Sequence, residues 1–218
     1  MDGAAGETLE TSPVLTGLVP TMADAVSALE TYVAAANRVA GARLKTAEGR
    51  PDRKALEREQ HLAHGLSWIA TYLEALRQTA EWAARLETDG KFGEIEALLS
   101  QILFSEYFAQ LVGGVPMNQG ETIRPHELGL LAETDTLFAH PAVNRLVTEG
   151  KTTASMAAAA RLLPDALSRN TVEETGLDET MSMVREQFAK FSSDKIKPHA
   201  HGWHMRNDYI PMDVVSEM

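Results

Sequence analysis

Apolar residues recur at alternating spacings of four and three in the long segments of this chain, and this period constrains the fold more than any other feature. The clearest run comprises Leu62, Leu66, Ile69, Leu73, Leu76, Ala80 and Ala83. Such spacing places the apolar side chains on one helical face and is typical of antiparallel helix packing. Period-two alternation rich in β-branched residues, the signal of a strand, is not found. The sequence therefore predicts an all-α fold.

Three long helices are predicted in the first half of the chain, at residues 21–44, 52–88 and 92–112. Asp52 is the expected N-cap of the second helix, since a carboxylate can accept hydrogen bonds from first-turn amides. The third helix is apolar on much of its circumference, so we expect it to be central and largely buried. Segment 117–133 is expected to be a loop-rich connector or a short helical turn.

Two shorter helices are predicted at residues 141–149 and 151–163. From Pro164 to Gly176 the apolar period gives way to Ser, Asn, Thr and Pro, which indicates a break between domains. The sequence thus predicts a flexible tail at 1–20, a helical bundle domain at 21–165, a linker at 166–176 and a second helical part at 177–218.

The last part reads as a helix, a polar turn and the start of another helix. Asp178 is its expected N-cap, and Pro198 is expected to end or kink the helix. Pro211 suits the first turn of the next helix. The two apolar faces comprise Met181, Val184, Phe188 and Phe191, and then Ile210, Val214, Val215 and Met218. Because this pattern stops without a C-cap, we expect the sequence to be cut from a longer one.

Composition excludes several classes of function. Apolar residues make up 44% of the 218 residues, which is enough for a core. The net charge of −11 argues against a nucleic-acid or anionic-membrane surface, and no apolar run reaches the length of a membrane span. The absence of cysteine excludes disulfides, thiolate zinc sites and a cysteine nucleophile, and it fits a cytoplasmic location. The acidic N-terminus does not resemble a transit peptide.

Three histidines close together, His199, His201 and His204, raise the possibility of a metal site. A metal ion would need all three imidazoles to converge with supporting partners. We favour solvated or packing histidines beside a buried Trp203, because no carboxylate follows at a fixed spacing.

Two other histidines, His61 and His64, follow Glu57 on the second predicted helix, with Glu57 one turn before His61. These residues could form a ligand face. A carboxylate-bridged di-metal bundle would also require a Glu-x-x-His motif on a partner helix, and none is found. We therefore interpret them as polar residues flanking the packing face.

Other candidate residues are isolated. Gly113 and Gly114 lack the Lys-Ser/Thr of a phosphate loop and are better interpreted as a helix stop. Arg124 and His126 are the best candidates for binding an anion, although an isolated Arg near Pro is more often structural. Glu106, within an apolar helix, either is buried with a raised pKa or pairs with an Arg of a neighbouring helix, which we favour. No Gly-x-Ser-x-Gly motif is present.

The C-terminal motifs resemble the opening of the acyl-CoA dehydrogenase family. They are Ile196-x-Pro-x-Ala, then Trp203-His204, then Ile210-Pro-x-x-Val-Val-x-Glu-Met. The segments His61–Gln78 and Phe92–Glu121 resemble the extra N-terminal helical domain of methylsuccinyl-CoA dehydrogenases and close relatives in that family. Together the matches cover about half of the chain, in an order that strengthens the resemblance.

The resemblance implies a flavin enzyme that desaturates an acyl-CoA thioester, with FAD as cofactor. In that family a carboxylate base removes the α-proton while the flavin N5 takes the β-hydride. Methylsuccinyl-CoA is then the first candidate substrate, an electron-transfer acceptor the redox partner, and a homo-oligomer the expected assembly. The flavin-binding β-domain and the catalytic glutamate would lie beyond Met218, so no catalytic, cofactor-binding or metal residue is assigned. The alternative is a stand-alone helical interaction or dimerisation module.

Overall fold

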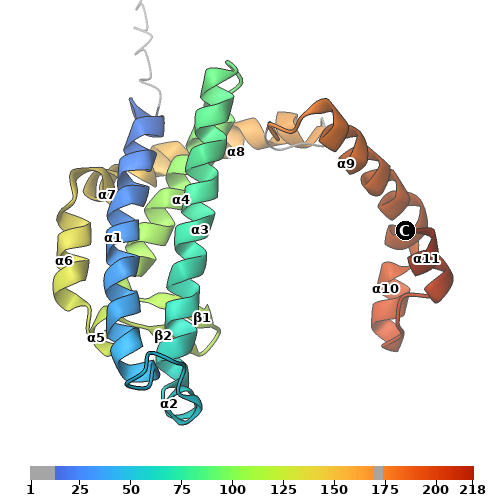
Figure 1. The fold of residues 1–218 in the computed structure, drawn as a ribbon. Helices are drawn as coiled ribbons and strands as arrows, with labels where there is room; N and C mark the ends of the chain where they lie inside the picture. Colours follow the sequence, from blue (N-terminus) through green and yellow to red (C-terminus); the bar gives the residue numbers. More distant parts are fainter. Residues whose placement is uncertain (1–12, 169–173) are drawn as a thin grey trace, which may run out of the picture. The chain divides into compact units, whose positions relative to one another are not determined.

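The computed structural model describes residues 13–168 and 174–218, which are helical over most of their length (Figure 1). The all-α fold predicted from the apolar period is confirmed. The chain divides into two compact units, Met1–Glu174 and Thr175–Met218, and each is described here by itself.

The first unit contains eight α-helices, one hairpin and one π-helical turn among its described residues. In chain order these are α1 (Leu18–Leu44), α2 (Arg53–Arg58), α3 (Gln60–Thr88), α4 (Glu94–Gly113), β1 (Val115–Asn118), β2 (Glu121–Ile123), α5 (Pro125–Leu128), α6 (Leu131–Ala139), α7 (Pro141–Arg145), η1 (Leu146–Gly150) and α8 (Thr153–Ser168).

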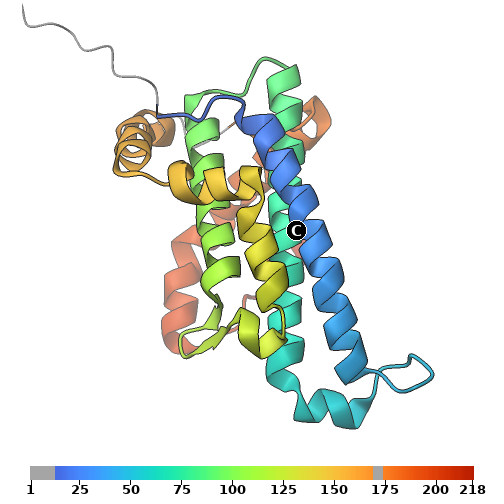
Figure 2. The ribbon, with the colours of Figure 1, turned by 90° about the vertical axis from the view of Figure 1, so that its left-hand side faces the viewer.

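The long helices α1 and α3 lie side by side, and α4 packs against both (Figures 1 and 2). Their shared interface forms the core, in which the side chains of Met22, Leu29, Leu76, Phe104 and Phe108 are fully buried. The predicted apolar face of α3 is confirmed, since six of its seven members are buried and Leu66 is partly buried. Burying each large apolar side chain contributes about 1.5–3 kcal/mol, so this interface supplies much of the stability of the unit.

The segment expected to be a loop-rich connector contains a hairpin and two helices. Strands β1 and β2 pair antiparallel, with Val115 opposite Ile123. Strands of four and three residues are too short for their alternation to be detected in the sequence. The side chain of Ile123 packs onto α3 at Gly65, where an added Cβ would lie 2.7 Å from the Ile123 side chain. Contacts with the long helices thus hold the hairpin in place.

The predicted helix over residues 52–88 is interrupted at Glu59, whose φ and ψ are −109° and 34°. Asp52 caps α2 as predicted, because its Oδ1 accepts hydrogen bonds from the amides of Lys54 and Ala55. The interruption carries no Gly or Pro signal. Instead, the Glu59 carboxylate binds the guanidinium of Arg43 at the end of α1. The helix break at Glu59 is therefore accompanied by an ion pair with Arg43, 16 positions earlier in the chain.

Parts of the predicted tail and linker make defined contacts or belong to a helix. Within the tail, the amide of Leu15 donates to Gln101 Oε1 at 3.0 Å, and Arg145 Nη1 donates to the carbonyl of Thr16 at 2.9 Å. Residues 1–12 of that tail lie outside the described residues. At the linker, α8 continues through Pro164 to Ser168, and residues 169–173 are not described.

The second unit contains α9 (Glu179–Phe191), the π-helical turn η2 (Ser192–Ile196), α10 (Lys197–Arg206) and α11 (Met212–Glu217). Asp178 caps α9 as predicted, with its Oδ1 2.8 Å from the amide nitrogen of Met181. Pro211 precedes α11 as predicted, whereas Pro198 lies in the first turn of α10 and does not end the helical segment. None of these four elements contains a buried residue. The apolar side chains of these helices are therefore accessible for packing against other protein segments.

Candidate functional site

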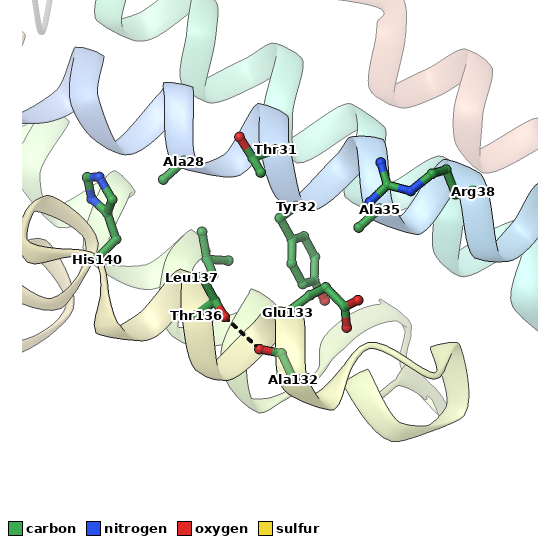
Figure 3. Close-up of a pocket in the computed structure, with 10 residues that line it drawn as sticks. All are labelled: Ala28, Thr31, Tyr32, Ala35, Arg38, Ala132, Glu133, Thr136, Leu137 and His140. Carbon is green, nitrogen blue, oxygen red and sulfur yellow. Dashed lines mark hydrogen bonds between the residues drawn. The ribbon is translucent and has the colours of Figure 1, made fainter.

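A cavity of about 330 Å³ lies between α1 and α6 (Figure 3). Helix α1 contributes Ala28, Thr31, Tyr32, Ala35 and Arg38, and α6 with its C-terminal end contributes Ala132, Glu133, Thr136, Leu137 and His140. The small side chains Ala28 and Ala35 lie two turns apart on α1, which leaves room between the helices. The cavity is mainly apolar and carries polar groups at several points of its lining.

Tyr32 is the most deeply buried polar group of this cavity, with 3% of its surface exposed. Its ring points from α1 towards α6 (Figure 3), and its hydroxyl accepts a hydrogen bond from Thr134 Oγ1 at 3.2 Å. Burial raises the pKa of the Tyr32 phenol above its usual value of 10.0. The phenol consequently stays protonated at neutral pH and can act as a hydrogen-bond donor.

Three of the further lining residues have ionisable side chains: Arg38, Glu133 and His140. Within the described residues, Arg38 and Glu133 form no ion pair with each other, and His140 Nδ1 is buried without a hydrogen-bond partner. In the described lining, no nucleophile is hydrogen-bonded to a base, which is the arrangement that covalent catalysis uses. None of these lining residues was predicted from the sequence, although the spacing of Ala28 and Ala35 is a usable signal.

The histidine pair on α3 lies against carboxylates from β2 and α5. His61 Nδ1 is 3.0 Å from Glu121 Oε1, and His61 Nε2 is 3.5 Å from Glu127 Oε1. His64 Nδ1 is 3.4 Å from Glu121 Oε2. These contacts connect the hairpin and α5 to α3, which agrees with the interpretation of the histidines as polar residues beside the packing face.

Trp68 occupies one ring nitrogen of His64. The indole Nε1 of Trp68 donates a hydrogen bond of 2.9 Å to His64 Nε2. A neutral imidazole that accepts at Nε2 carries its proton at Nδ1, and this nitrogen then donates towards Glu121. Over residues 13–168 and 174–218, no group of three or more His, Cys, Asp or Glu side chains is arranged to hold a metal.

The pKa values of two carboxyl groups in this cluster, Glu121 and Glu127, are lower than usual. The hydrogen bond from His61 is the largest cause that lowers the pKa of Glu121. For Glu127 the largest cause that lowers the pKa is the backbone amide of Arg124, which donates to Glu127 Oε2 at 2.8 Å. Both carboxylates are accessible to solvent and lose little hydration. Their pairing with the histidines therefore holds the hairpin in place with only a small desolvation penalty.

The histidines of α10 do not converge on a common point. His199, His201 and His204 are all exposed, and the ring of His199 lies 5.6 Å from that of Trp203 between centroids. Trp203 itself is only partly buried, contrary to the expectation of a buried ring. The packing interpretation is therefore correct for His199, and the indole remains accessible from one side.

The remaining candidates have structural partners. Arg124 Nη1 donates to the carbonyl oxygen of Gly113 at 2.6 Å, which ties the hairpin to the end of α4. Glu106 is paired as favoured, but with Lys151 Nζ at 2.7 Å in place of an Arg, and both side chains are 42% exposed. His126 is exposed. Neither Arg124 nor Glu106 therefore behaves as a buried functional group.

The cavity at the start of α4 does not fit the pyrophosphate of a dinucleotide. A pyrophosphate group requires a glycine-rich turn at a helix N-terminus or a cluster of basic side chains. The cavity at the start of α4, of about 490 Å³, is lined by Glu87 and Glu94, and the Glu96 carboxylate already occupies that helix end.

Comparison with known proteins gives one clear relationship. The chain is 45% identical over 208 residues, 94% of its own length, to the (2S)-methylsuccinyl-CoA dehydrogenase of Cereibacter sphaeroides, and it spans 37% of that relative. No protein-family model matches the chain. No helix in the described parts is both long and apolar enough to cross a lipid bilayer. The resemblance read from the sequence motifs is thus confirmed at the level of the family: the chain is related to part of an acyl-CoA dehydrogenase.

Proposed function

We propose that this chain, as a relative of acyl-CoA dehydrogenases, is the non-catalytic N-terminal part of a flavin-dependent enzyme that desaturates an acyl-CoA thioester. The observation that carries the proposal is the 45% identity over 94% of the chain. The relative is named for (2S)-methylsuccinyl-CoA, so methylsuccinyl-CoA is the first candidate substrate. A cytoplasmic location, an electron-transfer acceptor and a homo-oligomeric assembly belong to the same proposal.

The cofactor and the catalytic base would be supplied by the part of the enzyme that this chain does not span. The chain covers 37% of the relative's length, and its cavity at the start of α4 does not fit a pyrophosphate. FAD would accept the hydride of the desaturation when bound elsewhere in the parent enzyme. Residues 13–168 would then serve as an accessory bundle and residues 175–218 as the beginning of the dehydrogenase fold.

The exposed apolar surface of the second unit supports this division. Met181, Val184 and Phe188 on α9 are 49%, 42% and 51% exposed, and Met218 is 65% exposed. Each such side chain would contribute about 1.5–3 kcal/mol if buried, so a structure that covers them gains stability. Further helices of the parent enzyme would provide that cover.

The same surface favours a second candidate, a helical module that pairs with another protein or another copy. The enzyme and the interaction module predict different activities for a protein that extends beyond this chain. Only the enzyme should bind FAD and oxidise an acyl-CoA once residues beyond this chain are present.

The test compares this 218-residue chain with the full-length parent protein. Both are purified, their flavin absorbance is recorded, and oxidation of (2S)-methylsuccinyl-CoA is followed with an artificial electron acceptor. We expect near-stoichiometric FAD and activity in the parent, and neither in this chain. Activity or bound flavin in this chain would refute its non-catalytic role, and a parent that binds no flavin would refute the dehydrogenase proposal. A flavin-bound parent that oxidises a different acyl-CoA would refute the substrate alone.

A further inference from the structure

Glu96 is a buried carboxylate in the first turn of α4, with 6% of its surface exposed. Its Oε2 accepts a hydrogen bond of 3.1 Å from the amide of Gly93, which closes the N-terminal end of that helix. The positive end of the helix dipole favours a negative charge at this position. A buried carboxylate nevertheless needs partners for both oxygens, because an unpaired one is costly to remove from water.

The second oxygen of Glu96 is used by a residue 78 positions away. Its Oε1 accepts a hydrogen bond of 2.8 Å from the backbone amide of Glu174. The carbonyl oxygen of Glu174 in turn accepts a bond of 3.2 Å from the indole Nε1 of Trp82 on α3. Both backbone polar groups of Glu174 are therefore bound to the bundle.

The donor on α3 is itself held in place. The ring of Trp82 packs edge-on against that of Phe92, with centroids 6.2 Å apart and an interplanar angle of 81°. This arrangement is a favourable aromatic geometry, and it holds the indole whose nitrogen donates to the carbonyl of Glu174. Helices α3 and α4 thus present one donor and one acceptor to the same residue.

We propose that Glu96 and Trp82 form a latch on Glu174 that fixes where the chain leaves the bundle. Glu174 is the last residue of the first unit, and α9 begins at Glu179. With the latch closed, only residues 175–178 connect the anchored point to α9.

The latch is a conformational device, since it fixes the residue from which the tether to α9 starts and so limits the orientations open to the second unit. Short tethers keep two linked parts at a high effective concentration, and each added residue increases the accessible volume. Gly176 lies just after the anchor and has a φ of +65°, a backbone conformation that glycine adopts without steric cost. The latch does not depend on the proposed enzymatic function.

The decisive variant is Glu174→Pro in the complete chain, because proline removes the amide hydrogen that Glu96 accepts. Glu174→Ala is the matched control, since it changes the side chain and keeps both backbone groups. The chain has no cysteine, so cysteines introduced at the exposed positions Lys91 and Lys190 can carry spin labels without competition. We expect the distance distribution between the labels to broaden in Glu174→Pro and to stay unchanged in Glu174→Ala.

A second variant avoids any change to the backbone. Trp82→Phe removes the indole donor and keeps an aromatic ring beside Phe92. Loss of this bond should speed exchange of the Glu174 amide about fivefold to tenfold, in line with the value of one hydrogen bond. A circular dichroism melt of each variant reports whether the bundle remains folded.

Broadening in Glu174→Pro, faster exchange in Trp82→Phe, or both, with an intact bundle, supports the latch. Distance distributions and exchange rates equal to those of the control in both variants would overturn it. A bundle that unfolds in Glu174→Pro but not in Glu174→Ala would also overturn it, because the bond would then be part of the core and not of a tether.

Discussion

The side-chain amide of Gln101 donates a hydrogen bond of 3.0 Å to the carbonyl oxygen of Gly150, 49 residues further along the chain. Gln101 is fully buried, and it also donates to the carbonyl of Pro13 and accepts from the amide of Leu15, each at 3.0 Å. One buried polar side chain of α4 therefore joins this helix to the end of η1 and to the segment before α1. An amide group can satisfy these partners simultaneously because it carries two donors and an acceptor.

Gln101→Leu should destabilise the chain by about 2–4 kcal/mol, because it leaves buried backbone groups of separate segments without partners. The free energy of unfolding would be measured by urea titration. Ser100→Ala is the neighbouring control, since the Ser100 hydroxyl is buried without a partner among the described residues. That control should be neutral or slightly stabilising. Equal effects of the two substitutions would mean that the Gln101 bonds carry no net stability.

Gly150→Ala should destabilise the chain by about 1–3 kcal/mol through overpacking. A Cβ at this position would lie 2.8 Å from the carbonyl oxygen of Gln101 and 3.1 Å from Ser105 Cβ. Gly113→Ala is the matched control, because a Cβ added to that helical residue would have no neighbour within 4 Å among the described residues. The control should gain about 0.4–1 kcal/mol from the reduced entropy of the unfolded chain. A thermal melt of Gly150→Ala that matches the parent chain would contradict the close approach of α4 and η1.

His61→Ala should raise the pKa of Glu121 more than His64→Ala does, because the hydrogen bond from His61 is the largest cause of its lowered value. A lowered folded-state pKa stabilises the fold above about pH 4.5, and this contribution is lost as the pH falls through the lowered pKa. Carboxyl chemical shifts measured by NMR against pH would give both values. The pKa of Glu127 should rise less than that of Glu121 in His61→Ala, since the Arg124 amide that is the largest cause of its lowered value is kept and His61 contributes less. An unchanged Glu121 titration in His61→Ala would refute this pairing.

The amides of α9, α10 and α11 should exchange with solvent faster than those of α4. None of those three helices buries a residue, whereas α4 contributes Phe104 and Phe108 to the core. Few buried contacts permit local opening at low free energy. Hydrogen exchange followed by mass spectrometry would compare the segments in this chain and in the full-length parent. Protection of α9 equal to that of α4 in a monomer of this chain would mean that its apolar face is already covered.

The long helices could be predicted because their signals are local. The four-three spacing in α3 and the capping carboxylates of Asp52 and Asp178 act within a few residues, and all three predictions are confirmed. The interruption at Glu59, the hairpin and α6 were not predicted. Short elements carry too few residues for a period, and the contacts that position them come from distant segments.

The sequence by itself determined the all-α fold, the core face of α3, the caps of α2 and α9, and the family to which the chain is related. The tertiary structure alone decided which polar groups meet: Glu106 with Lys151, His61 with Glu121, and Glu96 with the backbone of Glu174. Periodicity and capping depend on neighbours along the chain, whereas these pairs lie 45 to 78 residues apart. Their distances follow from how whole helices pack, and no spacing in the sequence encodes that.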